Sequence, residues 1–288
     1  MISIVCWLWH DAGLQGPKTP HVRPHRPMVR SDLIPRAPRG ALREERRRLR
    51  EAFLNGRRDI PTGPARAARF FLPEHVNTLQ RAIARNLPEP HRFICITDST
   101  EGFAPEVEVI KTPASAARLA ELRTPEGPRF PSCYRRLWTF SDEARILGER
   151  VLVLDIDAVP TADLRPLFAM KADFVGWRPF RDWGKRLRFG GGIYLLTPGT
   201  RTAVWTEFTG PAAIQRARAA GFRGSDQAWI SYKLAEREPY WPNTSGIYSV
   251  RDLGPGEALP KDARLVQFNG HKKPWAYPGG TWVAAHWR

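Results

Sequence analysis

The stretch at residues 150–168, RVLVLDIDAVPTADLRPLF, is the most informative segment for the fold class. Four apolar residues, 151–154, lead directly into Asp155 and Asp157, and the segment ADLRPLF then indicates a turn into a short helix. A short continuous apolar run is typical of a strand that is buried on both faces of a sheet. Carboxylates at the end of such a strand need a partner, because burying an unpaired charge is costly.

Strand and helix patterns alternate along the rest of the chain. Strand patterns cover residues 2–9, 91–98, 107–111, 151–157, 173–177, 191–197 and 264–268, and helix patterns cover 73–87, 133–147 and 224–235. We expect Ser132 to cap the helix over 133–147 and Gly148 to end it. This alternation predicts an α/β sandwich with a mainly parallel central sheet.

Length and composition suit a globular protein. The chain has 288 residues, of which 42% are hydrophobic and 26% charged. We predict a single domain over residues 1–288, interrupted by an insert at about 10–71. No run of eighteen apolar residues exists, and the first residues have the pattern of a strand and not of a signal peptide. Three widely spaced cysteines favour reduced thiols and a cytoplasmic protein.

The net charge of +16 is concentrated in the predicted insert. Residues 17–73 contain 15 Lys and Arg against 5 Asp and Glu, so the remaining 231 residues carry a net charge of only +6. The insert is rich in Pro and Arg, which favours a solvated and partly disordered segment. The alternative is a surface that contacts an anionic membrane, at its inner face, or an anionic polymer.

The paired aspartates suit a cation. In an extended chain, Asp155 and Asp157 would project to the same side, roughly 6–7 Å apart. Two carboxylates at that spacing repel each other unless a cation lies between them, and oxygen ligands suit magnesium or manganese. Such a metal is well matched to a diphosphate. The alternative is a turn at the strand end, in which either aspartate caps backbone amides.

The run at residues 133–168 resembles the core of glycosyltransferases with the GT-A fold, and most of all family 8, the group of glycogenin and the bacterial lipopolysaccharide galactosyltransferases. The likeness covers residues 1–9 and about 72–288 and rests on an ordered series of motifs. It implies an enzyme, a hexosyltransferase that moves a sugar from a nucleotide-diphosphate sugar, such as a UDP-sugar, to a hydroxyl of a glycan or other acceptor. The resemblance also implies retention at the anomeric carbon and a manganese cofactor, with magnesium as the alternative.

Three motifs of the resemblance concern the donor and the metal. Arg136 matches an arginine that reaches the sugar nucleotide in similar enzymes, and the alternative is a surface arginine. Asp155 and Asp157 match the Asp-x-Asp motif that binds manganese, where Asp155 also touches the ribose. Gly190, Gly191 and Gly192 stand where family members carry Asn-Ala-Gly, so the side-chain hydrogen bond of that asparagine is missing, and glycine there lets the backbone approach the donor sugar.

Two further motifs lie later in the chain. Asp226 and Gln227 match a pair beside the donor sugar and the reacting carbon, although Ser225 or Asp226 could instead cap the helix that begins there. The stretch LVQFNGHKKPW matches a motif whose lysine, here Lys273, neutralises the diphosphate. The family's metal-binding histidine is replaced by Gln267, so either this neutral amide or His271 completes the metal site.

The residues that hold the base are left open by the sequence. Trp7, Trp9 and Asp98 are candidates, and each could equally serve packing or capping. A sugar-nucleotide pyrophosphorylase is a competing interpretation, but the segment WLWHDAGLQGPK lacks the glycine-rich phosphate loop that it needs. The other alternative is a degenerate domain that binds nucleic acid or an anionic surface through its basic insert, although a nucleic-acid partner is not what we expect.

Overall fold

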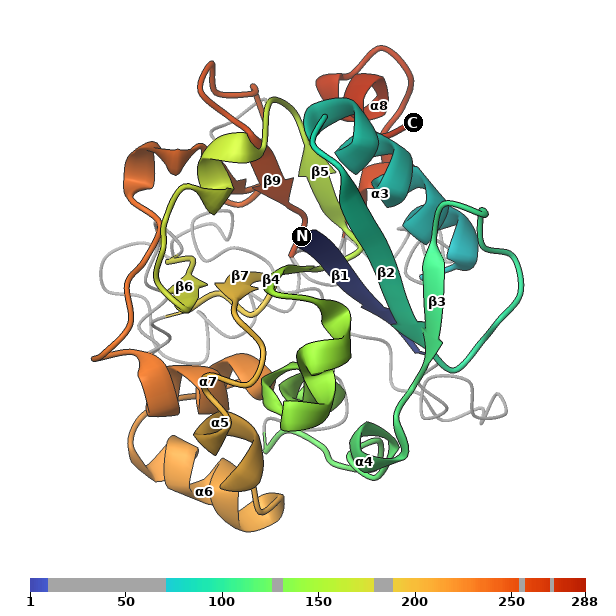
Figure 1. Cartoon of the computed structure of the whole chain (residues 1–288). Coiled ribbons are helices and arrows are strands. Elements are labelled where there is room, and N and C mark those ends of the chain that lie inside the picture. The colour runs from blue at the N-terminus through green and yellow to red at the C-terminus, as the bar shows by residue number, and fades with distance from the viewer. Residues whose placement is uncertain (10–70, 126–131, 179–188, 254–256, 270–271) are drawn as a thin grey trace, which may run out of the picture. The chain divides into compact units, whose positions relative to one another are not determined.

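The computed structural model describes residues 1–9, 71–125, 132–178, 189–253, 257–269 and 272–288 (Figure 1). Its strands are β1 (Ile2–Leu8), β2 (His91–Thr97), β3 (Glu108–Lys111), β4 (Arg150–Leu154), β5 (Ala158–Pro160), β6 (Phe174–Gly176), β7 (Ile193–Leu196), β8 (Ile247–Ser249) and β9 (Leu265–Gln267). Its α-helices are α3 (Pro73–Asn86), α4 (Ala114–Ala117), α5 (Ala203–Thr206), α6 (Pro211–Ala219), α7 (Asp226–Leu234) and α8 (Trp282–His286).

The described strands form two sheets. The six-stranded sheet has the order β3-β2-β1-β4-β7-β6, and a three-stranded sheet has the order β5-β9-β8. β3, β2, β1 and β4 run parallel to one another, whereas β7 is antiparallel to both β4 and β6. The prediction of a mainly parallel α/β sandwich is therefore confirmed. The carboxyl ends of four parallel strands meet at one edge, which is where open α/β sheets bind their ligands.

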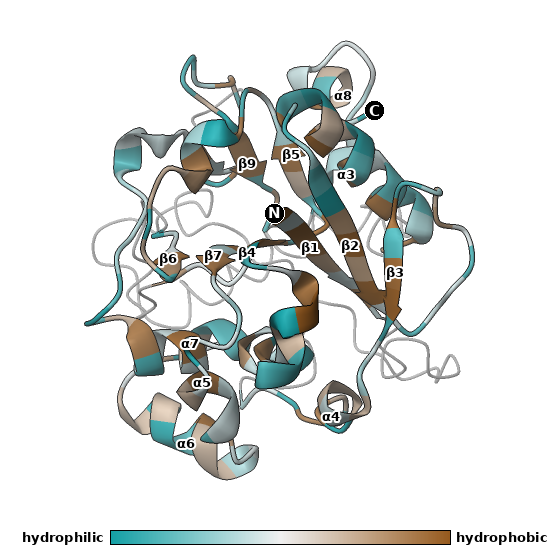
Figure 2. Cartoon of the chain, viewed as in Figure 1, coloured by the Kyte–Doolittle hydropathy of each residue, from teal (hydrophilic) through white to brown (hydrophobic). Residues whose placement is uncertain are grey.

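The central strands of the six-stranded sheet, β1, β4 and β7, are buried on both faces and are coloured mainly as hydrophobic in Figure 2, whereas the edge strand β3 has exposed residues at both ends. Ile4 and Leu152 belong to a core shared with α3, α8 and the small sheet, and Val5 and Val153 belong to a second core shared with α5, α6 and α7. Alternate side chains of a strand point to opposite faces, so each central strand must be apolar throughout. This explains the unbroken apolar run of residues 151–154.

The helix expected over residues 133–147 is replaced by two 3₁₀ helices. They span Tyr134–Phe140 and Asp142–Leu147, with Ser141 in an extended conformation between them. The expected capping by Ser132 was wrong, since Cys133 occupies the N-cap position of the first 3₁₀ helix and no side chain caps it. The second 3₁₀ helix is capped by Ser141, whose hydroxyl accepts a hydrogen bond from the amide of Ala144 at 3.3 Å. Serine competes in this way with a continuing helix by bonding to nearby backbone amides.

The strand of the opening stretch is shorter than predicted. β4 ends at Leu154, and Asp155 lies in a turn closed by the Ala158 amide, which donates to the Asp155 carbonyl at 3.1 Å. The extended spacing of the two carboxylates was therefore the wrong geometry, and they have different partners. β5 begins directly after the turn and pairs with β9, so the turn also carries the chain from the large sheet into the small one.

The predicted insert lies outside the described residues except for its last position, Phe71, so its boundaries and its role stay predictions. Among the described residues, no helix is long and apolar enough to cross a membrane. The cysteines Cys6, Cys95 and Cys133 are free thiols, as the sequence predicts.

Candidate functional site

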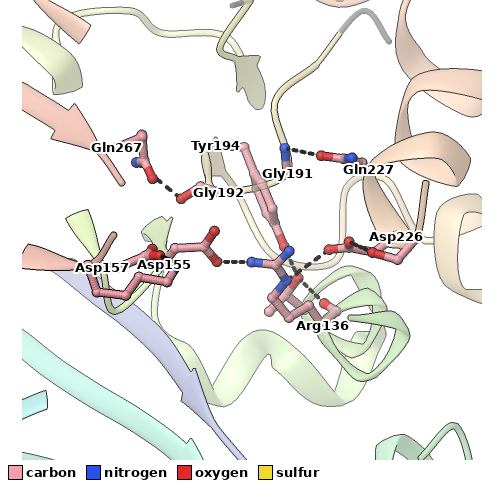
Figure 3. Close-up of polar contacts among 12 residues, drawn as sticks. Arg136, Asp155, Asp157, Gly191, Gly192, Tyr194, Asp226, Gln227 and Gln267 are labelled. Carbon is pink, nitrogen blue, oxygen red and sulfur yellow. Dashed lines mark hydrogen bonds and ion pairs between the residues drawn. The ribbon is translucent and has the colours of Figure 1, made fainter. Parts of the chain in front are cut away.

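Arg136 is the centre of a buried charge cluster at the carboxyl edge of the parallel strands (Figure 3). Its Nε donates to Asp226 Oδ2 at 2.8 Å, and its Nη1 pairs with Asp155 Oδ1. The side chains of Arg136 and Asp226 are 7% and 1% exposed. One guanidinium thus joins the end of β4 to the start of α7, and the interpretation of Arg136 as a surface residue is excluded.

The neighbours of this cluster fix its charges in place. Ser225 occupies the N-cap position of α7, but its hydroxyl donates to Asp226 Oδ1 at 2.8 Å and caps no backbone amide. Burial raises the pKa of Asp226, which the Arg136 guanidinium opposes. For Arg136 itself burial works to lower the pKa, but Asp155 and Asp226 hold it well above its usual value. Arg136 therefore carries a full charge beside two carboxyl groups.

Two residues of this cluster were not anticipated from the sequence. The Thr139 hydroxyl donates to the Arg136 carbonyl at 2.7 Å and lies 2.8 Å from the hydroxyl of Tyr194. Both side chains are buried, and they support the backbone that carries Arg136. Nothing in their sequence spacing links them, because Tyr194 lies on β7 and meets Thr139 only through the fold.

Asp157 has a different partner, Lys273. The Lys273 ammonium pairs with Asp157 Oδ2 and also donates to the Phe268 carbonyl at 3.0 Å. The Asp157 and Lys273 side chains are 6% and 14% exposed. Burial raises the pKa of Asp157 to about 6; the Lys273 ammonium opposes this rise, and the Asp155 carboxylate adds to it. The structure thus brings Lys273 together with the second aspartate of the Asp-x-Asp motif.

The unfolding free energy of the wild type, measured relative to Asp157→Asn, is expected to fall as pH rises from about 4 to about 7. The folded pKa of Asp157 lies above its ordinary value of 3.8. Its stabilising contribution is therefore complete below that ordinary value and is lost as pH rises through about 6. The change is of the order of 2–3 kcal/mol and can be measured by urea unfolding of both proteins.

Asp163→Asn is the control for this pH series, with the opposite sign. Hydrogen bonds from Arg165 lower the pKa of the exposed Asp163. The wild type should therefore gain stability relative to Asp163→Asn as pH rises through the ordinary range of a carboxyl group. If the stability of the wild type relative to Asp157→Asn and relative to Asp163→Asn changed with pH by the same slope, the burial of the Asp157 carboxylate would be contradicted.

The glycines and amides predicted from the resemblance line the same cluster. The Gly191 amide donates to Gln227 Oε1 at 3.2 Å, and Gln267 Nε2 donates to the Gly192 carbonyl at 3.3 Å. A methyl group on Gly192 would lie 2.7 Å from Asp155 Oδ2 and 2.8 Å from Gln267 Oε1. The two oxygens therefore border one small space, which only glycine leaves free.

The donor set around this space suits an oxygen-preferring cation. The Asp155 carboxylate and the Gln267 amide oxygen border it, the Asp157 carboxylate follows two residues further along the chain, and magnesium and manganese favour such oxygen ligands. Within the described ranges, no group of three or more His, Cys, Asp and Glu side chains is placed to hold a metal ion. A cation here would accordingly depend on Gln267 and on oxygens of the ligand. His271 lies outside the described residues and cannot be compared with Gln267.

A second polar group lies at the ends of β1 and β2. Arg135, which the sequence did not single out, donates from Nη1 to Asp98 Oδ2 at 2.7 Å. Its guanidinium carbon lies 5.6 Å from the ring centroid of Trp9. Trp7 contacts both Trp9 and Trp138 edge to face, each at 6.1 Å between ring centroids. The sequence signal that could have pointed to Arg135 is the pair of consecutive arginines at 135 and 136. In the structure, each of the two has a carboxylate partner of its own.

Comparison with known proteins supports the fold through structure alone. No protein-family profile matches the chain, and no curated protein matches it by sequence. Among solved structures, it is similar to galactosyltransferase LgtC in complex with donor and acceptor sugar analogs, at 16% identity and a TM-score of 0.52, over 74% of this chain and 89% of that chain. An active-site mutant of LgtC aligns over the same shares at 14% identity and a TM-score of 0.53. The glycosyltransferase GlyE of Streptococcus pneumoniae TIGR4 aligns at 14% identity and a TM-score of 0.48, over 74% of this chain and 56% of that chain.

The described chain has a GT-A-like glycosyltransferase fold. This confirms the fold class expected from residues 150–168 and the alternation around them. At these identities the likeness extends to the fold alone.

Proposed function

We propose that the chain is a metal-dependent glycosyltransferase that moves a sugar from a nucleotide-diphosphate sugar, a UDP-sugar by preference, to a hydroxyl acceptor. The observation that carries this proposal is the cluster at the carboxyl edge of the sheet. There Arg136 joins Asp155 to Asp226, and Lys273 pairs with Asp157. Carboxylates and cations that alternate in this way can hold both a divalent ion and an anionic diphosphate.

Each residue of the cluster has a separate task in this proposal. Asp155, Asp157 and Gln267 hold the divalent cation, manganese or magnesium. When bound, this cation supplies Lewis-acid stabilisation of the diphosphate. Lys273 lies beside Asp157 and neutralises the negative charge of the leaving group. Nucleotide sugars carry two phosphate charges, so a buried ammonium at this place suits them.

The donor sugar is proposed to lie against the segment with Gly191 and Gly192. A glycine backbone there leaves room for a ring that a side chain would exclude. Asp226 and Gln227, at the start of α7, orient its hydroxyl groups, and Arg136 positions the Asp226 carboxylate. We propose retention at the anomeric carbon and a hexose as the group transferred, on the family resemblance alone.

The competing proposal is a degenerate domain whose basic insert binds an anionic surface or a nucleic acid. It is favoured by the replacement of the expected histidine with Gln267. Against it stands the buried arrangement of the charges, since buried carboxylates cost stability and are retained where they serve a site. A steep loss of nucleic-acid affinity with salt, independent of manganese and UDP, would support the degenerate domain.

The test of the proposed function is a calorimetric titration of UDP into the protein, with manganese and again with EDTA. Binding that requires manganese is expected, and Asp157→Ala should abolish it. Asp163→Ala is the matched control, since Asp163 follows the next strand, β5, and its side chain is 37% exposed and pairs with Arg165. Absence of UDP binding to the wild type in both buffers would contradict a UDP-sugar site, and other nucleoside diphosphates would then be titrated.

Gly192→Ala is expected to weaken manganese-dependent UDP binding at least tenfold. Its methyl group would approach Asp155 Oδ2 and Gln267 Oε1 to less than 3 Å, so these ligands must move. Titration of UDP with manganese measures the loss. Gly279→Ala is the control, because a methyl group there has no atom within 4 Å. Equal affinities for the two variants would exclude a close role for Gly192.

A further inference from the structure

Two buried hydroxyl groups link β7 to the backbone of Arg136, and Figure 3 shows the Tyr194 side chain reaching from β7 toward Arg136. The Thr139 hydroxyl donates its only hydrogen to the Arg136 carbonyl at 2.7 Å. The Tyr194 hydroxyl lies 2.8 Å from Thr139 Oγ1. Because a hydroxyl has one hydrogen but can accept further bonds, Tyr194 must be the donor of this second hydrogen bond. The two hydroxyl groups therefore form a directed chain that ends at the backbone of Arg136.

The position of the Tyr194 hydroxyl is determined by the packing of its ring. The ring stacks with that of Phe140 at 5.4 Å between centroids and with that of Phe174 at 5.8 Å. Tyr194 is 1% exposed, and burial raises the pKa of its hydroxyl, which therefore stays protonated as a donor. A bond from a threonine hydroxyl to a nearby carbonyl of its own helix is a common local arrangement. The bond from Tyr194 is different, because it comes from a strand 55 residues further along the chain.

Tyr194 also belongs to the element that carries the glycine segment, residues 190–192. β7 begins directly after Gly192, so Tyr194 lies two residues beyond it. A methyl group on Gly191 would lie 3.4 Å from Arg136 Nη2, so the guanidinium faces the glycine segment. The other two guanidinium nitrogens pair with carboxylates, whereas Nη2 makes no hydrogen bond within the described part of the chain. A ligand beside the glycine segment would therefore meet a free N–H group of Arg136.

We propose that Tyr194 and Thr139 are positioning residues that set the distance between the Arg136 guanidinium and the glycine segment. This inference rests on the proposed function and deepens it. Arg136 lies on a 3₁₀ helix, whose hydrogen-bond geometry is poorer than that of an α-helix. The chain of hydroxyl groups restrains this helix from β7, so the two sides of the donor site move as one unit. Both side chains are buried, and they act on the ligand only through Arg136.

The first experiment removes single hydroxyl groups and titrates UDP into the manganese-loaded protein. Tyr194→Phe keeps the stacked ring, and Thr139→Val keeps the branched shape. Each is expected to weaken UDP binding about threefold to tenfold, the effect of one hydrogen bond. Thr139→Ser restores the hydroxyl and should bind UDP within about twofold of the wild type. Tyr240→Phe is the matched control and should leave the affinity unchanged, because the Tyr240 hydroxyl donates to the Ala235 carbonyl at 3.1 Å.

The second experiment is a double-mutant cycle, which a merely structural role of Tyr194 would not affect. Arg136→Lys keeps the positive charge but removes Nη2. If Tyr194 acts through this group, adding Tyr194→Phe to Arg136→Lys should not weaken UDP binding further. In a Lys273→Gln background, Tyr194→Phe should keep its full effect, because Lys273 pairs with Asp157 and has no contact with the hydroxyl chain.

The outcomes separate this inference from the proposed function. If the wild type binds none of UDP, GDP, ADP and CDP with manganese, the proposed function is overturned and this inference falls with it. If the wild type prefers another of these nucleotides to UDP, that nucleotide is the probe for the same variants. Wild-type affinity in both Tyr194→Phe and Thr139→Val overturns the positioning role alone. An equal loss in Thr139→Ser and Thr139→Val, or an equal effect of Tyr194→Phe in the two backgrounds, also overturns it.

Discussion

An Arg136→Met variant is expected to lose about 3–5 kcal/mol of unfolding free energy, because it removes the cation that two carboxylates share. Asp226 is completely buried and would lose its counter-ion. Urea unfolding at neutral pH measures the loss. The loss should shrink at low pH, since burial already raises the pKa of Asp226 and protonation removes the unpaired charge.

Arg145→Met is the control for this prediction. Arg145 pairs with Asp142 at 3.4 Å, but its side chain is 63% exposed, and exposed pairs contribute less than about 1 kcal/mol. The double variant Arg136→Met/Asp226→Asn should recover part of the loss, because both members of one buried pair are then neutral. Similar losses of unfolding free energy in Arg136→Met and Arg145→Met would contradict the conclusion that Arg136 is the centre of the buried charge cluster.

The sequence predicted the elements that are determined by burial. The apolar run 151–154 and the apolar positions of residues 73–87 each follow from packing against a core, which a sequence pattern records directly. The break at Ser141 was not predicted, because it depends on a side chain that competes with the helix for one backbone amide. Local hydrogen bonds of this kind leave no periodic pattern.

The candidate site was predicted as a set of residues but not as a set of pairs. Arg136, Asp155 and Asp226 come from three separate segments, and their shared ion pairs exist only after the strands and α7 have assembled. The Asp-x-Asp spacing suggested two carboxylates facing one cation. The turn after β4 instead gives Asp155 to Arg136 and Asp157 to Lys273. The prediction from the Asp-x-Asp spacing assumed that the chain stays extended through both aspartates. The chain instead turns at Asp155 before β5 begins.

The ion pairs of Asp155 and Asp157 affect how a divalent cation and a diphosphate would bind. Each carboxylate already has a cationic partner, so a divalent cation must compete with Lys273 for Asp157. A diphosphate that arrives with the cation offers Lys273 a new anionic partner and makes the exchange favourable. We therefore expect metal affinity to rise in the presence of UDP, since binding linkage is reciprocal.

Lys273→Gln is expected to lower the turnover of the preferred UDP-sugar about 100-fold to 1,000-fold, which is the effect of removing one group that stabilises developing charge. The ammonium lies at Asp157 and faces the proposed diphosphate, and a neutral amide cannot offset the charge of departing UDP. Release of UDP from a panel of UDP-sugars measures turnover. Urea unfolding of the variant shows whether the unpaired Asp157 also lowers stability, so the two effects can be separated.

Lys272→Gln is a closely matched control for this prediction, because it changes the neighbouring lysine. The Lys272 side chain is 52% exposed, lies 3.8 Å from Glu257 and contacts the ring of Tyr277. It has no partner in the charge cluster among the described contacts, so turnover should stay within about twofold of the wild type. Lys273→Arg keeps a cation and should retain more activity than Lys273→Gln. Equal turnover in Lys272→Gln and Lys273→Gln would show that the buried ammonium has no part in the departure of the leaving group.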